Sequence, residues 1–224
     1  MLKRILSKVG ENKRDVPFLR GRIHYLLIIY FSSLLKNAKD DSIPLETRYA
    51  MLIFMICVTL NMVGSSLLHS NQLYMYRSAY KRIDIASIFL VISGNMFPMY
   101  VHYMNKDSAM GVVASIQWFM TFLGAFGSLV FDFCSVSKDV RSVIFFLTSV
   151  PNMYLFYRMY MCGHYLPLSC LVVAYWLTAS GVIIFCMEKP CPFRGVFESH
   201  ELFHGICVLN CGVVILANTL VIRS

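Results

Sequence analysis

The chain alternates between long apolar blocks and short polar joints. Most blocks are close to the roughly 20 residues that a helix needs to cross about 30 Å of hydrocarbon. No water satisfies the backbone at that depth, so each block is expected to be a helix. The seven blocks cover residues 23–35, 49–69, 84–103, 110–131, 142–160, 165–187 and 200–221.

The first block is the shortest of the seven. IHYLLIIYFSSLL, at 23–35, reaches only about 20 Å as a helix. It can span only if Arg22 and Lys36 extend to the headgroups or the bilayer thins locally. If the block instead lies on the membrane surface, six spans remain and the amino-terminal tail shares a side with the next joint. Seven spans give the clearer charge asymmetry between the two sides, and we favour them.

The composition agrees with a membrane protein. Hydrophobic residues make up 58% of the chain and charged residues only 14%, whereas soluble domains carry about 25% charged residues. Several of the eight cysteines lie inside apolar blocks, where a thiol behaves as a small hydrophobe, so no disulfide framework is expected. We therefore expect an all-α membrane protein, a seven-transmembrane helix bundle formed by residues 23–224.

The formal charge of +8 is concentrated in residues 1–22, which form a basic tail. Such a tail can bind nucleic acid, but in so hydrophobic a chain it is expected to meet anionic lipid headgroups. We therefore expect membrane lipids as partners and no nucleic acid. With seven spans, the positive-inside rule places the amino terminus and the tail in the cytoplasm, in the plasma membrane or an endomembrane.

Four polar features stand at ends of the apolar blocks. The second block ends in GSSLLHS, which places Ser65 one helical turn before His69 on the same face. The third block opens with Asp84, and the seventh opens with His200 and His204, four residues apart. Because chain direction alternates between spans, all of these residues are expected at the same membrane face, whichever side is inside.

These residue types suit a hydrolytic metal centre. Three histidines and a water form a tetrahedral zinc site with an open position, which is the catalytic arrangement. Zinc lowers the pKa of its bound water to about 7 and polarises a carbonyl group. Asp84 can accept the water's proton, and the Ser65 hydroxyl can donate to a developing oxyanion. The set predicts hydrolysis of an amide or ester in a lipid.

Each residue also has a simpler explanation. His69 alone is typical of a membrane interface, Asp84 of a helix cap, and Ser65 of helix packing. Their meeting at one face favours the metal site. Cys207 and Cys211 continue the histidine stripe more deeply and are interpreted as packing residues. Three histidines at other block ends receive no role: His24, His102 and His164.

The segment from His200 to His204 also reads H-E-x-x-H, the helical zinc motif of metalloproteases, in which Glu201 would be the general base. The residues after His204 contain no histidine or acid for a third ligand, which would have to be His69 or Asp84. An intramembrane metalloprotease therefore remains an alternative.

The order S-x-x-x-H, then Asp, then H-x-x-x-H resembles the hemolysin III family, the related progestin and adipoQ (adiponectin) receptors and, more distantly, the alkaline ceramidases. Gly94 and Pro98 in VISGNMFP resemble that family's Gly…Pro signature after the aspartate. Ser199 in SGVIIFCMEKPCPFRGVFESHELFH resembles its junction between the sixth and seventh spans. The resemblance covers roughly residues 45–224.

The resemblance implies zinc bound by His69, His200 and His204, with Asp84 holding the zinc-bound water and Ser65 close by. It also implies seven spans, a cytoplasmic amino terminus and a site near the cytoplasmic face. The family's polar residues at the first span, Glu, Asn and Thr-His, are not recognisable here. Within this resemblance, a signalling receptor with structural zinc and a membrane-permeabilising hemolysin are the alternatives to a hydrolase.

Overall fold

The computed structural model describes residues 17, 19, 21–69, 76–131, 133 and 135–224. The basic tail predicted for residues 1–22 lies almost wholly outside this part. The described chain is helical, with one isolated β-bridge between Phe193 and Phe197. Its helices are η1 (a 3-10 helix, Ile23–Tyr30), α2 (Phe31–Ala38), α3 (Leu45–His69), α4 (Arg77–Gly94), α5 (Phe97–Met104), α6 (Ser108–Val130), α7 (Lys138–Ser149), α8 (Asn152–Met161), α9 (Tyr165–Met187) and α10 (Ser199–Ile222).

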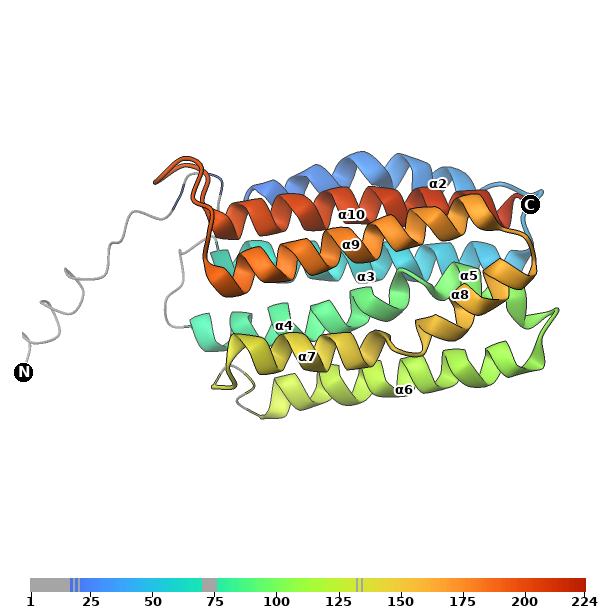
Figure 1. Cartoon of the computed structure of the whole chain (residues 1–224), viewed down its shortest axis with the longest axis horizontal. Helices are drawn as coiled ribbons and strands as arrows, with labels where there is room; N and C mark the ends of the chain where they lie inside the picture. Colours follow the sequence, from blue (N-terminus) through green and yellow to red (C-terminus); the bar gives the residue numbers. More distant parts are fainter. Residues whose placement is uncertain (1–16, 18, 20, 70–75, 132, 134) are drawn as a thin grey trace, which may run out of the picture.

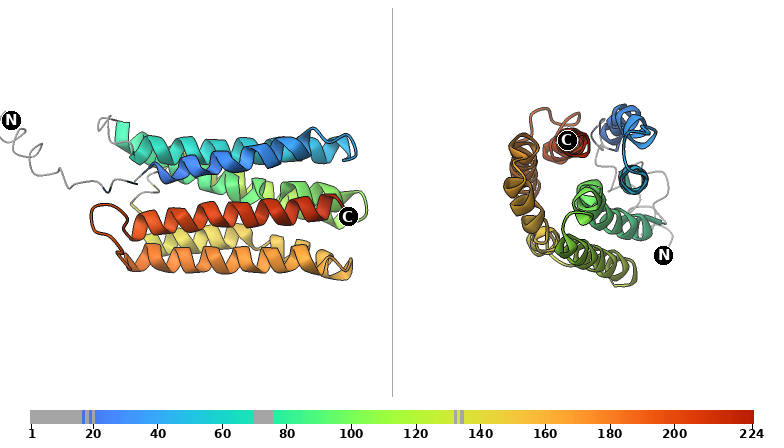
Figure 2. Two further views of the ribbon diagram at one scale, coloured as in Figure 1. Left: turned by 90° about the horizontal axis from the view of Figure 1, so that it is seen from above. Right: turned by 90° about the vertical axis from the view of Figure 1, so that its right-hand side faces the viewer.

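The helices run side by side along the long axis of the molecule (Figure 1). Each packs against its neighbours in chain order, from η1 and α2 through α3, α4 and α5, α6, α7 and α8, to α9 and α10. The end-on view shows them as a ring, which α10 closes by packing against η1 (Figure 2). The first and last helices of the described chain are therefore direct neighbours.

All seven predicted blocks are helical, but two of them are broken by proline. Pro98 stands in the first turn of α5 and separates it from α4, and Pro151 separates α7 from α8. Proline lacks a backbone N–H and its ring clashes with the carbonyl four residues earlier, so a helix cannot continue undisturbed through it. The first block is longer than predicted, because α2 continues η1 as far as Ala38.

Five helical stretches in the described residues are long and apolar enough to cross a membrane, against the seven spans predicted. The other two segments, η1 with α2 and α7 with α8, consist of helices of 8, 8, 12 and 10 residues. The five stretches are Leu45–His69, Arg77–Met104, Ser108–Val130, Tyr165–Met187 and Ser199–Ile222.

The outer surface of the bundle is apolar and parts of the interior are polar. Trp176 on α9 is 73% exposed and Phe119 on α6 is 68% exposed. Between α4 and α6, in contrast, the Gln117 amide donates to the Ser93 hydroxyl over 2.9 Å, and Ser93 also hydrogen-bonds Thr121. Apolar outer faces of this extent suit lipid rather than water.

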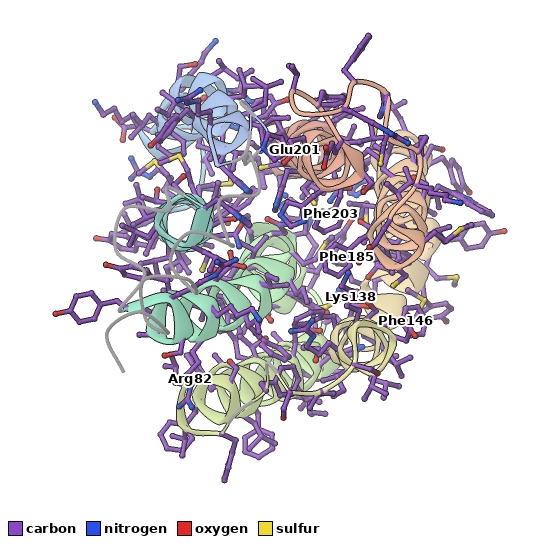
Figure 3. All side chains as sticks on the ribbon, turned by 90° about the vertical axis from the view of Figure 1, so that its left-hand side faces the viewer. Arg82, Lys138, Phe146, Phe185, Glu201 and Phe203 are labelled. Atoms are coloured by element: carbon purple, nitrogen blue, oxygen red, sulfur yellow. The ribbon has the colours of Figure 1, made fainter. Side chains whose placement is uncertain are left out.

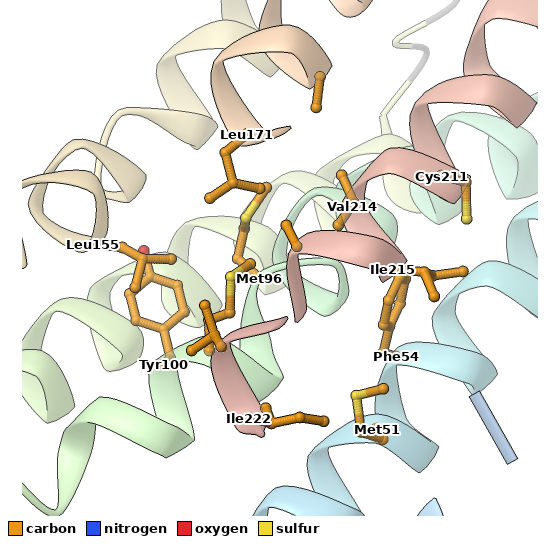
Figure 4. Packing of buried hydrophobic residues seen from close by; sticks show 14 of the residues in the cluster. Met51, Phe54, Met96, Tyr100, Leu155, Leu171, Cys211, Val214, Ile215 and Ile222 are labelled. Atoms are coloured by element: carbon orange, nitrogen blue, oxygen red, sulfur yellow. The ribbon is translucent and has the colours of Figure 1, made fainter. Parts of the chain in front are cut away.

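The main apolar core lies in the half of the bundle that holds the carboxyl end of α10 (Figure 4). Met51 and Phe54 of α3 pack there with Val214 and Ile215 of α10, all at most 4% exposed. Cys211 belongs to the same cluster, as predicted, whereas Cys207, also interpreted as a packing residue, is exposed and lies outside it. Side chains of α3 and α10 therefore share one apolar core, away from the helix ends that carry the histidines.

Glycine lets α3 and α4 approach closely. A Cβ atom added at Gly94 would lie 2.7 Å from Cys57 Cβ, and one at Gly64 would lie 3.4 Å from Asp84 Cα. The glycine of the predicted Gly…Pro signature therefore marks a helix crossing. The same approach brings the first turns of α4 beside the last turns of α3, which carry His69.

Candidate metal centre

Three histidine side chains converge at one end of the bundle. The His69 and His200 Nε2 atoms are 3.1 Å apart, and the His200 and His204 Nε2 atoms are 2.9 Å apart. One ligand atom from each histidine lies within 4.8 Å of the other two. Nitrogen ligands about 2.0–2.1 Å from a tetrahedral zinc are about 3.3 Å from one another. The predicted meeting of the three histidines is thus confirmed, at separations close to those of a tetrahedral metal site.

Helix ends position the three ligand rings. His69 is the last residue of α3, and α10 starts at Ser199, so His200 and His204 occupy its first two turns. Residues four apart share one face of a helix, which directs both α10 imidazoles toward α3. A capping box of Glu198 and Glu201 fixes the start of α10. The ligand set therefore rests on the last turn of α3 and on the capped first two turns of α10.

The chemistry of the three rings favours a bound cation. A neutral imidazole has one N–H donor and one acceptor nitrogen. When three Nε2 atoms lie this close together, hydrogen bonds among the rings leave some nitrogen lone pairs facing each other. A central cation instead accepts one lone pair from each of the three rings. Imidazole ligands suit zinc, copper, iron and nickel ions. The residues present therefore fit a divalent transition metal.

Ser65 and Asp84 lie next to each other, on α3 and α4, toward the end of α3 that carries His69. Ser65 is 1% exposed, one turn before His69, and the Asp84 carboxyl group is close enough for the Ser65 hydroxyl to stabilise its charge. Ser65 Oγ makes no other hydrogen bond within the described part of the chain. Asp84 is not one of the converging ligand groups there. The pair is therefore a hydroxyl and a carboxyl group in mutual contact, near the end of α3.

Glu201, the glutamate of the H-E-x-x-H pattern, caps its own helix. Its side chain accepts a hydrogen bond from the Glu198 backbone N–H over 2.9 Å, and it is fully buried at 0% exposure. This contact is half of the capping box, which satisfies amide groups at the start of a helix. The capping contact therefore gives Glu201 a structural role, separate from the role of general base that the metalloprotease pattern would assign to it.

Aromatic rings and an ion pair lie next to His200; Phe185, Phe203 and Lys138 are labelled in Figure 3. The Phe185 ring on α9 lies 6.0 Å from the His200 ring and 5.1 Å from the Phe203 ring. The Lys138 ammonium is 5.1 Å from the centre of the Phe185 ring and pairs with Glu188. This hydrogen bond from Lys138 lowers the pKa of the Glu188 carboxyl group. The contacts tie α7 and α9 together next to the histidine centre.

A fourth histidine, for which no role was predicted from the sequence, reaches the centre. His24 is 3% exposed, and its ring centre lies 4.2 Å from that of His204. The alternation of chain direction was the available signal, since it places the start of the first block at the same face as the end of the second. His102 and His164 lie at the opposite end, where Tyr103 hydrogen-bonds His164.

A sequence model of the haemolysin-III related family matches residues 13–215. No curated protein matches the chain. The matched region includes His69, Asp84, His200 and His204, together with most of the helical ring.

Proposed function

The chain belongs to the haemolysin-III related family, and we propose that it is a zinc-dependent membrane hydrolase that cleaves an amide or ester bond of a lipid. The five apolar helices and the family make it a multi-pass membrane protein. The observation that carries the proposal is the convergence of three histidine nitrogens within 4.8 Å at one end of this bundle.

The three histidines favour zinc in a catalytic setting. Three protein ligands leave a fourth tetrahedral position open, as in zinc hydrolases. Zinc held there supplies a water of lowered pKa and polarises a substrate carbonyl. Asp84 takes up the proton of the attacking water and returns it to the amine or alcohol that leaves as the C–N or C–O bond breaks. Once Asp84 is protonated, the Ser65 hydroxyl is released from the carboxylate and donates a hydrogen bond to the carbonyl oxygen as it gains charge.

A lipid substrate is favoured by the surroundings of the histidines. The outer surface is apolar, so molecules that reach this end of the bundle from the membrane are amphiphilic. Phe185 and Phe203 offer apolar rings beside His200, while Lys138 and Glu188 form a polar pair at the same end. An amphiphile can then place its polar bond near the histidines with its chain against the aromatic rings.

We further propose seven crossings with a cytoplasmic amino terminus. The segments η1 with α2 and α7 with α8 complete the ring formed by the five long helices. Basic side chains gather at the histidine end: Figure 3 labels Arg82 and Lys138 there, and Arg141 lies in the first turn of α7, which starts at Lys138. By the positive-inside rule this end faces the cytoplasm, which places the metal centre near the cytoplasmic membrane face.

The experiment measures metal content and lipid hydrolysis on the same purified protein. The wild-type chain is expected to hold about one zinc and to cleave members of a panel of fluorogenic lipid amides and esters. The variant with both His200→Ala and His204→Ala should lose zinc and hydrolysis together. A matched double variant, His102→Ala with His164→Ala, removes two histidines from the opposite end. It should keep both its zinc and its lipid hydrolysis.

Two outcomes would reject the proposal. Stoichiometric zinc in the His200→Ala, His204→Ala protein would show that the metal is bound elsewhere. Zinc-loaded wild-type protein that cleaves no amide or ester in the panel would leave the centre without the proposed chemistry.

A further inference from the structure

His24 is packed into the histidine centre although it belongs to a different segment from the three converging ligands. Its ring meets that of His204 edge to face, with the ring planes inclined at 66°. The side chain is 97% buried, and its Nε2 atom has no hydrogen-bond partner among the residues that the structure describes. A buried polar atom without a partner is costly to a fold, so this nitrogen indicates a group that joins it at the centre.

The chain just before His24 is held tightly against α3. Gly21 has a φ of +78°, and a Cβ atom added there would lie 2.9 Å from His69 Cβ. The Ser66 hydroxyl donates to the Gly21 carbonyl oxygen over 3.3 Å. The turn that introduces η1 is therefore in contact with the residue that supplies the α3 ligand.

The same segment is also held along α10. A Cβ atom added at Gly205 would lie 3.4 Å from Ile23 Cδ1, and one at Gly212 would lie 2.6 Å from the Tyr30 hydroxyl. Small residues allow two helices to approach closely in a membrane. Because η1 contacts both ligand-bearing helices, the position of His24 relative to His204 is set by packing on two sides.

We propose that His24 is a positioning residue of the metal centre: its ring fixes the orientation of His204, and its Nε2 hydrogen-bonds an oxygen atom of the water or substrate held at the three histidines. The inference rests on the metal part of the proposed function, and not on hydrolysis. Groups that orient metal ligands and their bound oxygens typically change metal affinity about 10- to 100-fold when they are removed.

His24→Phe tests the nitrogen, because it keeps an aromatic ring and removes the polar atoms. The metal-free variant should melt at the same or a higher temperature than the wild type, since an unpaired buried nitrogen is gone. Its zinc affinity, measured by chelator competition, should fall about 10- to 100-fold. His102→Phe is the matched control: His102 Nε2 is also buried without a described partner, but at the other end of the bundle. It should leave zinc affinity unchanged.

His24→Gln provides a rescue, since its amide nitrogen can reach about the place of the imidazole Nε2. It should recover most of the affinity that His24→Phe loses, and the visible spectrum of the cobalt-substituted protein should return toward that of the wild type. If His24→Phe binds zinc as tightly as the wild type, or if glutamine restores no more affinity than phenylalanine, the inference is wrong. A wild-type protein that binds no zinc would instead reject the proposed metal centre itself.

Discussion

The Nε2 atoms of His69 and His200 lie 3.1 Å apart, although 131 residues separate the two histidines in the chain. Their contact depends on the closure of the helical ring, in which η1 packs against both α3 and α10. The first segment is thus part of the construction of the centre. Substitutions in this segment should therefore change the affinity of the centre for its metal.

Gly21→Ala should weaken zinc binding through His69. The new methyl group would lie 2.9 Å from His69 Cβ, and the residue would keep a positive φ. The backbone term alone costs about 1–2 kcal/mol for a residue with a Cβ atom. This cost lowers the stability of the fold. Displacement of the His69 ligand should separately lower zinc affinity by roughly 10- to 100-fold, measured by chelator competition.

Gly163→Ala separates these two effects. Gly163 also has a positive φ, +75°, but no atom lies within 4 Å of its added Cβ among the residues that are described. This variant should show the backbone cost as a lower melting temperature, with zinc affinity as in the wild type. Equal affinity losses in both variants would mean that Gly21 acts through general destabilisation and not through His69.

Glu201→Gln should leave hydrolysis nearly intact. Glutamine also serves at the third position of a capping box, so the start of α10 is preserved. The variant should lose less than about 1 kcal/mol of unfolding free energy, from the helix-dipole interaction. Its rate constant should stay within about threefold of the wild type, whereas loss of a metalloprotease base would lower the rate by roughly 10²–10⁴-fold. A drop of that size would make Glu201 the base and remove Asp84 from that role.

The meeting of His69 with the α10 histidines was accessible from the sequence for a simple physical reason. Apolar blocks of membrane-spanning length force the chain to reverse direction at each joint, so block ends can be assigned to one of two faces. The i, i+4 spacing of His200 and His204 then places both rings on one side of a helix. Both rules use only local information, and both held.

Other parts of the centre depend on contacts that no local pattern encodes. His24 has no second ligand at helical spacing. The alternation of chain direction places it at the face of His69, unlike His102 and His164, but does not predict which side chains at that face are in contact. Its place against His204 results from the close approach of η1 to α10 at Gly205 and Gly212. The glutamate in H-E-x-x-H matched a catalytic pattern, while its side chain closes a capping box. The sequence motif does not distinguish these two uses.

Two native cysteines can test which end of the bundle faces the cytoplasm. Cys191 lies between α9 and α10 at the histidine end, Cys162 lies between α8 and α9 at the other end, and both are exposed. In sealed vesicles with the cytoplasmic face outward, a membrane-impermeant maleimide should modify Cys191 directly and Cys162 only after detergent is added. Cys191→Ser and Cys162→Ser identify the two labelled sites by mass spectrometry. The opposite order of labelling would invert the proposed orientation.

Asp84→Asn should separate a hydrolase from a receptor that uses the same metal. Asparagine has nearly the shape of aspartate, and Asp84 is outside the set of converging ligands, so zinc should be retained at about one per chain. Asparagine cannot accept the proton of an attacking water, so lipid hydrolysis should fall by about 10²–10⁴-fold. The two measurements are zinc content and single-turnover rate on the same preparation.

The contrast between those two measurements decides the role of Asp84. In a receptor whose zinc only braces the helices, the variant would keep its metal and its response to ligand, and there would be no hydrolysis to lose. Loss of zinc together with activity would make Asp84 part of the metal-holding structure. Retained zinc with an unchanged hydrolysis rate would exclude Asp84 as the proton acceptor. Only retained zinc with a lost rate fits a carboxyl group that, beside Ser65, acts on the attacking water.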